Sequence, residues 1–186
     1  MNYFNRLIFA SLFAAALAFA QGGPHFGIHV GLGMEALAFS TEDEDIINGE
    51  PTRLVFAIGG VYSMPLSESV TLAPEALLNY AALPGEKSSD ISLDIPVMFK
   101  FFTLDYLYLQ VGPQLGFSFY YADNEKGKKS KDRNSFNAGP TFGLGYQIDA
   151  SSSIDVRCYY GMTKYFDVVD PGAQAFQALL GYTYLF

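Results

Sequence analysis

The segment from residue 106 to residue 122 alternates, one residue at a time, between large apolar side chains and small or polar ones. The large side chains are Leu107, Leu109, Val111, Leu115, Phe117 and Phe119. The positions between them hold Tyr108, Gln110, Gly112, Gln114, Gly116, Ser118 and Tyr120. Successive side chains of a β-strand point to opposite faces of the sheet, so this pattern predicts a strand with one bulky face. The glycines and the proline of this uncharged segment disfavour a lipid-facing helix.

The same period-two alternation recurs along the chain and predicts eight strands. Their approximate ranges are 25–38, 53–63, 69–82, 91–102, 106–122, 135–148, 153–164 and 175–186. Strands of about ten residues are long enough to cross a bilayer when tilted. Short turns are expected near 65–68, 103–105 and 149–152, and longer polar connections at 41–52, 84–90, 122–134 and 166–174. Alternation of short and long connections is typical of a membrane barrel, whose long loops are extracellular.

The distribution of charge decides which face points inward. The small-residue face also carries six charged side chains: Glu35, Glu75, Asp94, Lys100, Asp155 and Arg157. The interior of an eight-stranded barrel is just wide enough for side chains to fill it, so the bulky face must point outward into lipid. A soluble, lipocalin-like barrel would instead bury that face. The prediction is an all-β fold, an eight-stranded antiparallel up-and-down transmembrane β-barrel.

The first twenty residues read as a secretory signal peptide. Arg6 precedes an apolar run over 7–19, and Ala18-Phe19-Ala20 forms a small-x-small cleavage site. We therefore expect a signal peptide at 1–20 and a β-barrel domain at 21–186, in the bacterial outer membrane. Cys158, the only cysteine, cannot form an internal disulfide. The net charge of −8 argues against nucleic acid as a partner.

Several segments resemble the outer-membrane β-barrel domain family typified by PorT. The stretches LDIPVMFKFF (93–102) and LYLQVGPQLGF (107–117) resemble its central hairpin. The segments LAPEALLNY (72–80), NAGPTFGLGYQI (137–148) and GYTYLF (181–186) fit the flanking and closing strands. The resemblance covers nearly the whole mature chain and implies fold and location. It says little about function, because one fold hosts many functions.

No catalytic, cofactor or metal motif stands out in the sequence. His25 and His29 share a face with Glu35, which would suit a metal site or, with a serine, a lipid deacylase. No third metal ligand can be named, and residues lining a wet lumen explain the same pattern.

Three charge features point to interactions instead. The inward carboxylates Glu75, Asp94 and Asp155 are expected to pair with Lys100 and Arg157 and to plug the lumen, although a gated channel could use the same groups. The connection at 41–52 is acidic, with Glu42, Asp43, Glu44, Asp45 and Glu50. The connection at 122–134 is basic, with Lys126, Lys128, Lys129, Lys131 and Arg133. The basic connection could contact anionic lipopolysaccharide, or the two connections could simply attract each other in solvent.

The aromatic row Tyr182, Tyr184 and Phe186 resembles the closing-strand signal that the barrel-assembly machinery reads in outer-membrane proteins. The leading hypothesis is a monomeric, non-enzymatic barrel without cofactors, with a structural or surface-interaction role, whose partners are outer-membrane lipid, lipopolysaccharide and that machinery. A narrow pore or small-ligand-binding barrel is the alternative. An outer-membrane lipid-modifying enzyme is the third.

Overall fold

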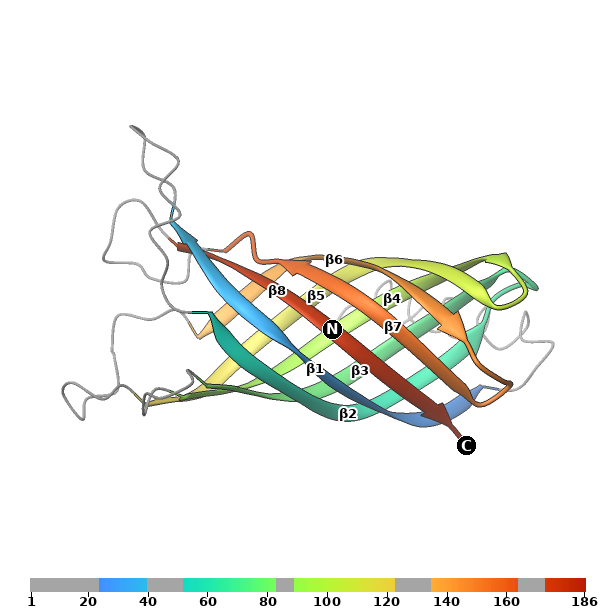
Figure 1. Cartoon of the computed structure of the whole chain (residues 1–186), viewed down its shortest axis with the longest axis horizontal. Coiled ribbons are helices and arrows are strands. Elements are labelled where there is room, and N and C mark those ends of the chain that lie inside the picture. Colours follow the sequence, from blue (N-terminus) through green and yellow to red (C-terminus); the bar gives the residue numbers. More distant parts are fainter. Residues whose placement is uncertain (1–23, 40–51, 83–88, 123–134, 164–172) are drawn as a thin grey trace, which may run out of the picture.

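A computed structural model describes residues 24–39, 52–82, 89–122, 135–163 and 173–186. The expected signal peptide at 1–20 and the charged residues of the acidic and basic connections lie outside these ranges. The described residues form eight strands (Figure 1). They are β1 (His25–Phe39), β2 (Arg53–Pro65), β3 (Val70–Ala82), β4 (Ser89–Leu104), β5 (Leu107–Ala122), β6 (Phe136–Gln147), β7 (Ser152–Tyr160) and β8 (Ala173–Leu185).

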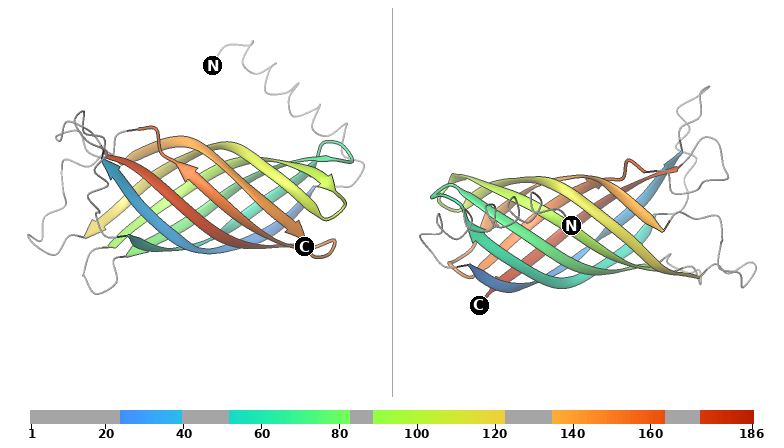
Figure 2. Two further views of the ribbon diagram at one scale, coloured as in Figure 1. Left: turned by 45° about the horizontal axis from the view of Figure 1, so that its top comes forward. Right: turned by 180° about the vertical axis from the view of Figure 1, so that it is seen from behind.

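The strands close into one antiparallel barrel in sequence order, with β8 paired back to β1 (Figure 2). Each strand is hydrogen-bonded to its neighbours along the chain, which is the predicted up-and-down order. Closure leaves no unpaired strand edge, which a lipid environment requires because nothing there can hydrogen-bond an exposed backbone. The predicted fold class is therefore confirmed.

Large apolar side chains cover the outside of the barrel, as predicted. Leu144 is 55 % exposed and Leu180 60 %, whereas the inward-facing Ala57 and Ala73 are fully buried. So extensive an apolar surface is rare on a soluble monomer and fits contact with lipid tails. None of the described residues forms a helix long and apolar enough to cross a membrane.

One end of the barrel carries three short connections, at 66–69, 105–106 and 148–151, close to the predicted turns. In the last of these, the Asp149 carboxylate accepts hydrogen bonds from the backbone N–H groups of Ser151 and Ser152, both at 2.8 Å. These two bonds favour the ionised carboxylate and hold the pKa of Asp149 below its usual value. At the opposite end, which we call the long-connection end, β1, β3, β5 and β7 finish and β2, β4, β6 and β8 begin.

Two predictions about the strands were wrong. Tyr120 shares parity with Tyr108 and was expected to face inward, but the structure leaves it half-exposed on the outer surface. The pairing of β4 with β5 shifts by one residue: Ile91 lies opposite Tyr120 and the next residue, Ser92, opposite Ser118. A bulge of this kind moves the following side chain to the other face. In addition, β7 ends at Tyr160 rather than near residue 164.

Candidate functional site

Arg157 holds two carboxylates at the centre of the lumen. Its Nη1 lies 2.6 Å from Oε2 of Glu75, and its Nε lies 2.5 Å from Oδ1 of Asp155. A further bond of 3.2 Å joins Nη2 to Oδ2 of Asp155. All three side chains are almost completely buried. Asp155 precedes Arg157 by two residues on β7, so both side chains point into the lumen.

The ion pair between Arg157 and Glu75 crosses the barrel. Arg157 is on β7 and Glu75 on β3, and the closed order places these strands four apart in either direction around the barrel. They are therefore on opposite walls, and a direct 2.6 Å contact between their side chains closes the space between them. Bonds to two carboxylates offset the cost of burying the guanidinium.

His29 borders this cluster from β1. Its Nδ1 is hydrogen-bonded to Oγ1 of Thr183 at 2.9 Å and lies 3.4 Å from Nη2 of Arg157. Gly181 leaves room for the imidazole, because a Cβ there would lie 2.4 Å from Cε1 of His29. A side chain at position 181 would therefore displace the ring.

The His25, His29 and Glu35 grouping considered from the sequence is not assembled. Nδ1 of His25 lies 3.3 Å from the carbonyl oxygen of Phe186, at the end of the barrel that carries the short connections. Glu35 is ten residues further along β1, where its Oε1 lies 3.6 Å from Nη1 of Arg53. A strand rises about 3.3 Å per residue, so the two ends of this grouping are too far apart to share one ion.

Lys100 is buried beside the cluster but does not pair as predicted. It forms no ion pair with any carboxylate among the described residues. Its ammonium instead lies 5.0 Å from the centroid of the Tyr108 ring, a cation–π contact. Tyr108, Met98 and Gln110 are all almost completely buried. Gln110 lies opposite Lys100 in the pairing of β4 with β5.

Asp94 also lies apart from Arg157, which corrects the predicted pairing. Its Oδ2 accepts a hydrogen bond from Nε2 of Gln114 at 2.8 Å, and Oε1 of Gln114 accepts one from the hydroxyl of Thr141 at 2.9 Å. Asp94 is opposite Leu77 on β3, two positions beyond Glu75 toward the long-connection end. Alternation predicts which residues face the lumen but not their position along the barrel axis. Asp94 therefore faces the lumen as predicted, but it lies nearer the long-connection end than the Arg157 cluster does.

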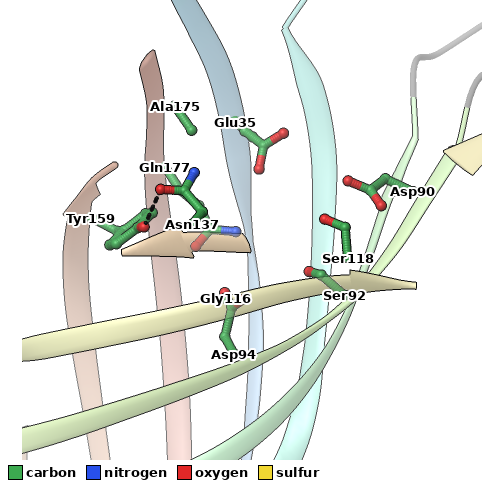
Figure 3. A pocket seen from close by; sticks show the side chains of 10 residues that line it. All are labelled: Glu35, Asp90, Ser92, Asp94, Gly116, Ser118, Asn137, Tyr159, Ala175 and Gln177. Atoms are coloured by element: carbon green, nitrogen blue, oxygen red, sulfur yellow. Dashed lines mark hydrogen bonds between the residues drawn. The ribbon is translucent and has the colours of Figure 1, made fainter. Parts of the chain in front are cut away.

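A small polar pocket, which we call the mouth pocket, lies beside Asp94 (Figure 3). Its volume is about 30 Å³. Its lining residues are Glu35, Asp90, Ser92, Asp94, Gly116, Ser118, Asn137, Tyr159, Ala175 and Gln177. They come from β1, β4, β5, β6, β7 and β8, so the pocket reaches across the lumen. In it, the Tyr159 hydroxyl donates a hydrogen bond to Oδ1 of Asn137 at 2.9 Å.

Sequence analysis missed part of this pocket. Asp90 was assigned to a loop, and Arg53 and Gln177 were given no role. Asp90 has the same parity as Asp94, so a fourth strand that began two residues earlier would have placed its side chain inside. Arg53 already lay at the start of the predicted second strand, with the same parity as Val55 and Ala57.

The three aromatic residues predicted as an assembly signal lie on the outer face. Tyr182 and Tyr184 alternate outward along β8, and Phe186 follows the strand with 72 % of its surface exposed. The rings of Tyr184 and Phe186 lie 5.8 Å apart, edge to face. The backbone N–H of Phe186 donates to the carbonyl oxygen of Phe26 at 2.7 Å, which extends the β1–β8 pairing by one residue.

Comparison with protein families matches residues 19–167 to the outer membrane protein β-barrel domain. The chain belongs to this family. Membership, together with the apolar exterior, places the barrel in the bacterial outer membrane. A comparison with curated protein sequences gives no match.

Solved outer-membrane barrels share the fold. Neisserial surface protein A is 14 % identical, with a TM-score of 0.65, over 88 % of this chain and 99 % of the other. Ail, the attachment invasion locus protein of Yersinia pestis, is 12 % identical, with a TM-score of 0.50, over 87 % of this chain and 98 % of the other. A second Ail structure, in complex with the heparin analogue sucrose octasulfate, is 13 % identical, with a TM-score of 0.50, over 88 % and 99 %. At such identities the likeness extends to the fold alone.

Proposed function

We propose that this protein is a non-enzymatic outer-membrane barrel with a structural or surface-interaction role, and that its lumen is closed to ions. The contact between Arg157 and Glu75 carries the proposal, because it joins opposite walls of the barrel. Met98, Tyr108 and Gln110 fill the lumen beside it. A path for hydrated ions would need these buried groups to separate, at the cost of unpaired buried charge.

Planar-bilayer recording tests closure. The purified wild-type protein should insert without reproducible unitary conductance. A variant with Glu75→Ala, Tyr108→Ala and Arg157→Ala should conduct, which shows that the method detects an open form of this barrel. Stepwise conductance of the wild-type protein would instead favour a narrow pore.

The surface-interaction role is proposed to involve anionic lipopolysaccharide. The segment from Lys126 to Arg133 contains five basic residues in eight positions, a density typical of anion-binding patches. An outer-membrane barrel of the same fold, Ail, has been solved with a sulfated heparin analogue, so the fold is compatible with such ligands. Replacing the five basic residues with glutamine should reduce retention on lipopolysaccharide-containing vesicles. Replacing the five acidic residues of 42–50 should not, and equal loss from both variants would reject the assignment.

The route to the membrane is part of the proposal. Residues 1–20 would be removed on export, the barrel-assembly machinery would insert the chain, and the barrel would act as a monomer of the PorT-like type. Mass spectrometry of the outer-membrane form should give a chain that begins at Gln21. Hydrolysis of lipid A or phospholipid by the purified protein would overturn the non-enzymatic assignment.

A further inference from the structure

We infer that an apolar groove on the outside of the barrel is a binding site for one acyl chain of a phospholipid. The groove, which we call the seam groove, has a volume of about 360 Å³. Its walls are the side chains of Val30, Leu32, Phe56, Ile154, Leu180 and Tyr182. They belong to β2, β1, β8 and β7, which lie side by side in that order (Figure 1).

Strand pairing explains the shape of the seam groove. Gly31 of β1 lies directly opposite Gly181 of β8, and both also line the groove. Both occupy inward-facing positions, so on the outer face only their backbone forms the floor. The outward side chains of the residue pairs before and after them form the two walls. The groove therefore lies over the seam where the last strand closes on the first.

A hydrogen bond keeps the two walls apart. The Tyr182 hydroxyl donates to Oγ of Ser152 at 3.3 Å. Ser152 begins β7 at the end that carries the short connections, whereas Leu32 and Leu180 form the wall nearer the long-connection end. The bond thus holds the tyrosine ring away from the opposite wall. Val30, the partner of Tyr182 in the strand pairing, is short and leaves the space between the walls open.

The seam groove runs obliquely across the barrel wall. Ile154 is two residues from the start of β7, at the end with the short connections. Phe56 is three residues from the start of β2, at the long-connection end. Neighbouring strands are about 4.8 Å apart, so four strands give the groove a length of about 14 Å. A hollow of this length and volume suits an extended hydrocarbon chain.

The position of the groove in the membrane determines its occupant. Family membership and the apolar exterior put this face of the barrel in contact with lipid chains. The short turns of such barrels face the periplasm, where the leaflet of the outer membrane consists of phospholipids. A chain that enters beside Ile154 and Tyr182 therefore belongs to a phospholipid and not to lipopolysaccharide.

The affinity of such a site comes from packing. Lipid tails are as apolar as leucine side chains, so a chain gains no hydrophobic free energy when it leaves the surrounding bilayer. It gains van der Waals contacts with the walls and floor of the groove, which are individually small and add along the chain. We expect a preference for the groove over neighbouring surface, with continued exchange of the lipid.

Photo-crosslinking tests the site on the full chain. The protein is reconstituted into phosphatidylcholine vesicles that contain a small fraction of phosphatidylcholine with a diazirine in the middle of one acyl chain. After irradiation, peptide mass spectrometry should find labelling of Leu32 and Leu180 about three-fold stronger than that of Leu109 and Leu144, through the summed packing contacts. All four leucines are about half-exposed or more, so exposure alone predicts no such difference.

The position of the diazirine tests the direction of entry. A probe with the diazirine near the ester should label Ile154 and Tyr182, and one with the diazirine near the terminal methyl group should label Phe56. The reverse order would place the entry at the long-connection end and would overturn the assignment to a phospholipid.

Two substitutions separate the groove from the rest of the lipid-facing surface. Val30→Phe fills the groove and should reduce the labelling of Leu32 and Leu180 to that of Leu144. Val111→Phe is the matched control, because Val111 is an outward valine on β5, four strands from β1. It should leave the labelling unchanged, and heat-modifiability on gels verifies that both variants are folded. Labelling that follows exposure alone, or that survives Val30→Phe, would overturn the inference.

Discussion

The ring of Tyr108 lies directly over Gly145. The two residues are opposite each other in the pairing of β5 with β6, and a Cβ at position 145 would lie 2.0 Å from Cζ of the tyrosine. The ring also contacts the Lys100 ammonium, and its centroid lies 5.2 Å from that of Phe102. The missing side chain at Gly145 thus lets a large aromatic residue lie flat inside a narrow barrel.

Gly145→Ala should therefore destabilise the barrel. The added methyl group has to displace a buried ring, and overpacking of this kind costs about 1–3 kcal/mol. Urea unfolding in lipid vesicles measures the effect. Gly60→Ala is the matched control, because a Cβ there meets nothing within 4 Å. Equal losses for the two variants would show that the Tyr108 contact is not the cause.

The outward face gives a second prediction. Leu109 and Leu144 are opposite each other on β5 and β6, and both are about half-exposed. An arginine at either position would lie in the apolar part of the bilayer and should cost about 2–4 kcal/mol in the same unfolding experiment. Glu68→Arg, at an exposed turn, should cost much less. Similar losses at all three positions would contradict the assigned orientation.

The inward face of Glu75, Asp94, Lys100, Asp155 and Arg157 was predictable from the sequence, but the partner of each side chain was not. Alternation assigned Glu75 and Arg157 to the lumen because lipid and lumen accept opposite side chains. Which residue of β3 meets which residue of β7 depends on the stagger of all the strands between them. Each hairpin adds its own shift in strand register, and no local sequence pattern reveals the total shift between β3 and β7. Asp94 was therefore matched with the wrong level, and Lys100 with carboxylates instead of an aromatic ring.

Local irregularities limited the prediction in a different way. The bulge beside Phe119 turns the Tyr120 side chain to the outer face, and no feature of this uncharged aromatic segment predicts a bulge there. Asp90 follows a polar stretch and resembles a loop residue, although backbone pairing carries β4 back to Ser89. Both errors fall at the long-connection end, so part of the mouth pocket was missed.

The outward aromatic row of β8 gives a third prediction. If Tyr182, Tyr184 and Phe186 are read during assembly, Phe186→Ala should lower the folded, heat-modifiable fraction in outer-membrane preparations. Phe26→Ala is the control, because Phe26 is an equally exposed aromatic residue at the same rim. Refolding of both variants from urea into vesicles should be similar, since that process needs no recognition. Normal assembly of Phe186→Ala in cells would reject the signal.

Asp149 gives a prediction about pH. Its folded-state pKa is depressed by hydrogen bonds from the Ser151 and Ser152 backbone. The stabilisation is fully present above the unfolded-state pKa, about 3.9, and is lost as the pH falls through the lower folded-state value. NMR titration of the side-chain carboxyl carbon of Asp149 should show a midpoint below the unfolded-state value of about 3.9. A midpoint at or above that value would contradict the hydrogen-bonded turn.

The Arg157 cluster gives the last prediction. Arg157→Met leaves Glu75 and Asp155 buried without their cation, and breaking a buried pair in this way costs about 3–5 kcal/mol. Adding Glu75→Gln should recover part of the loss, because the second change removes one of the stranded charges. A double-mutant cycle of Arg157→Met with Glu75→Gln, measured by urea unfolding in vesicles, gives the coupling directly.

A second cycle with Asp155→Asn should also show coupling, because Asp155 contacts Nε and Nη2 of the same guanidinium. The cycle with Asp94→Asn is the control and should be nearly additive, since Asp94 is hydrogen-bonded to Gln114 at the other level. Coupling to Asp94 as strong as coupling to Glu75 would mean that the two levels of the lumen are one network, and the ion pair would no longer account for closure by itself.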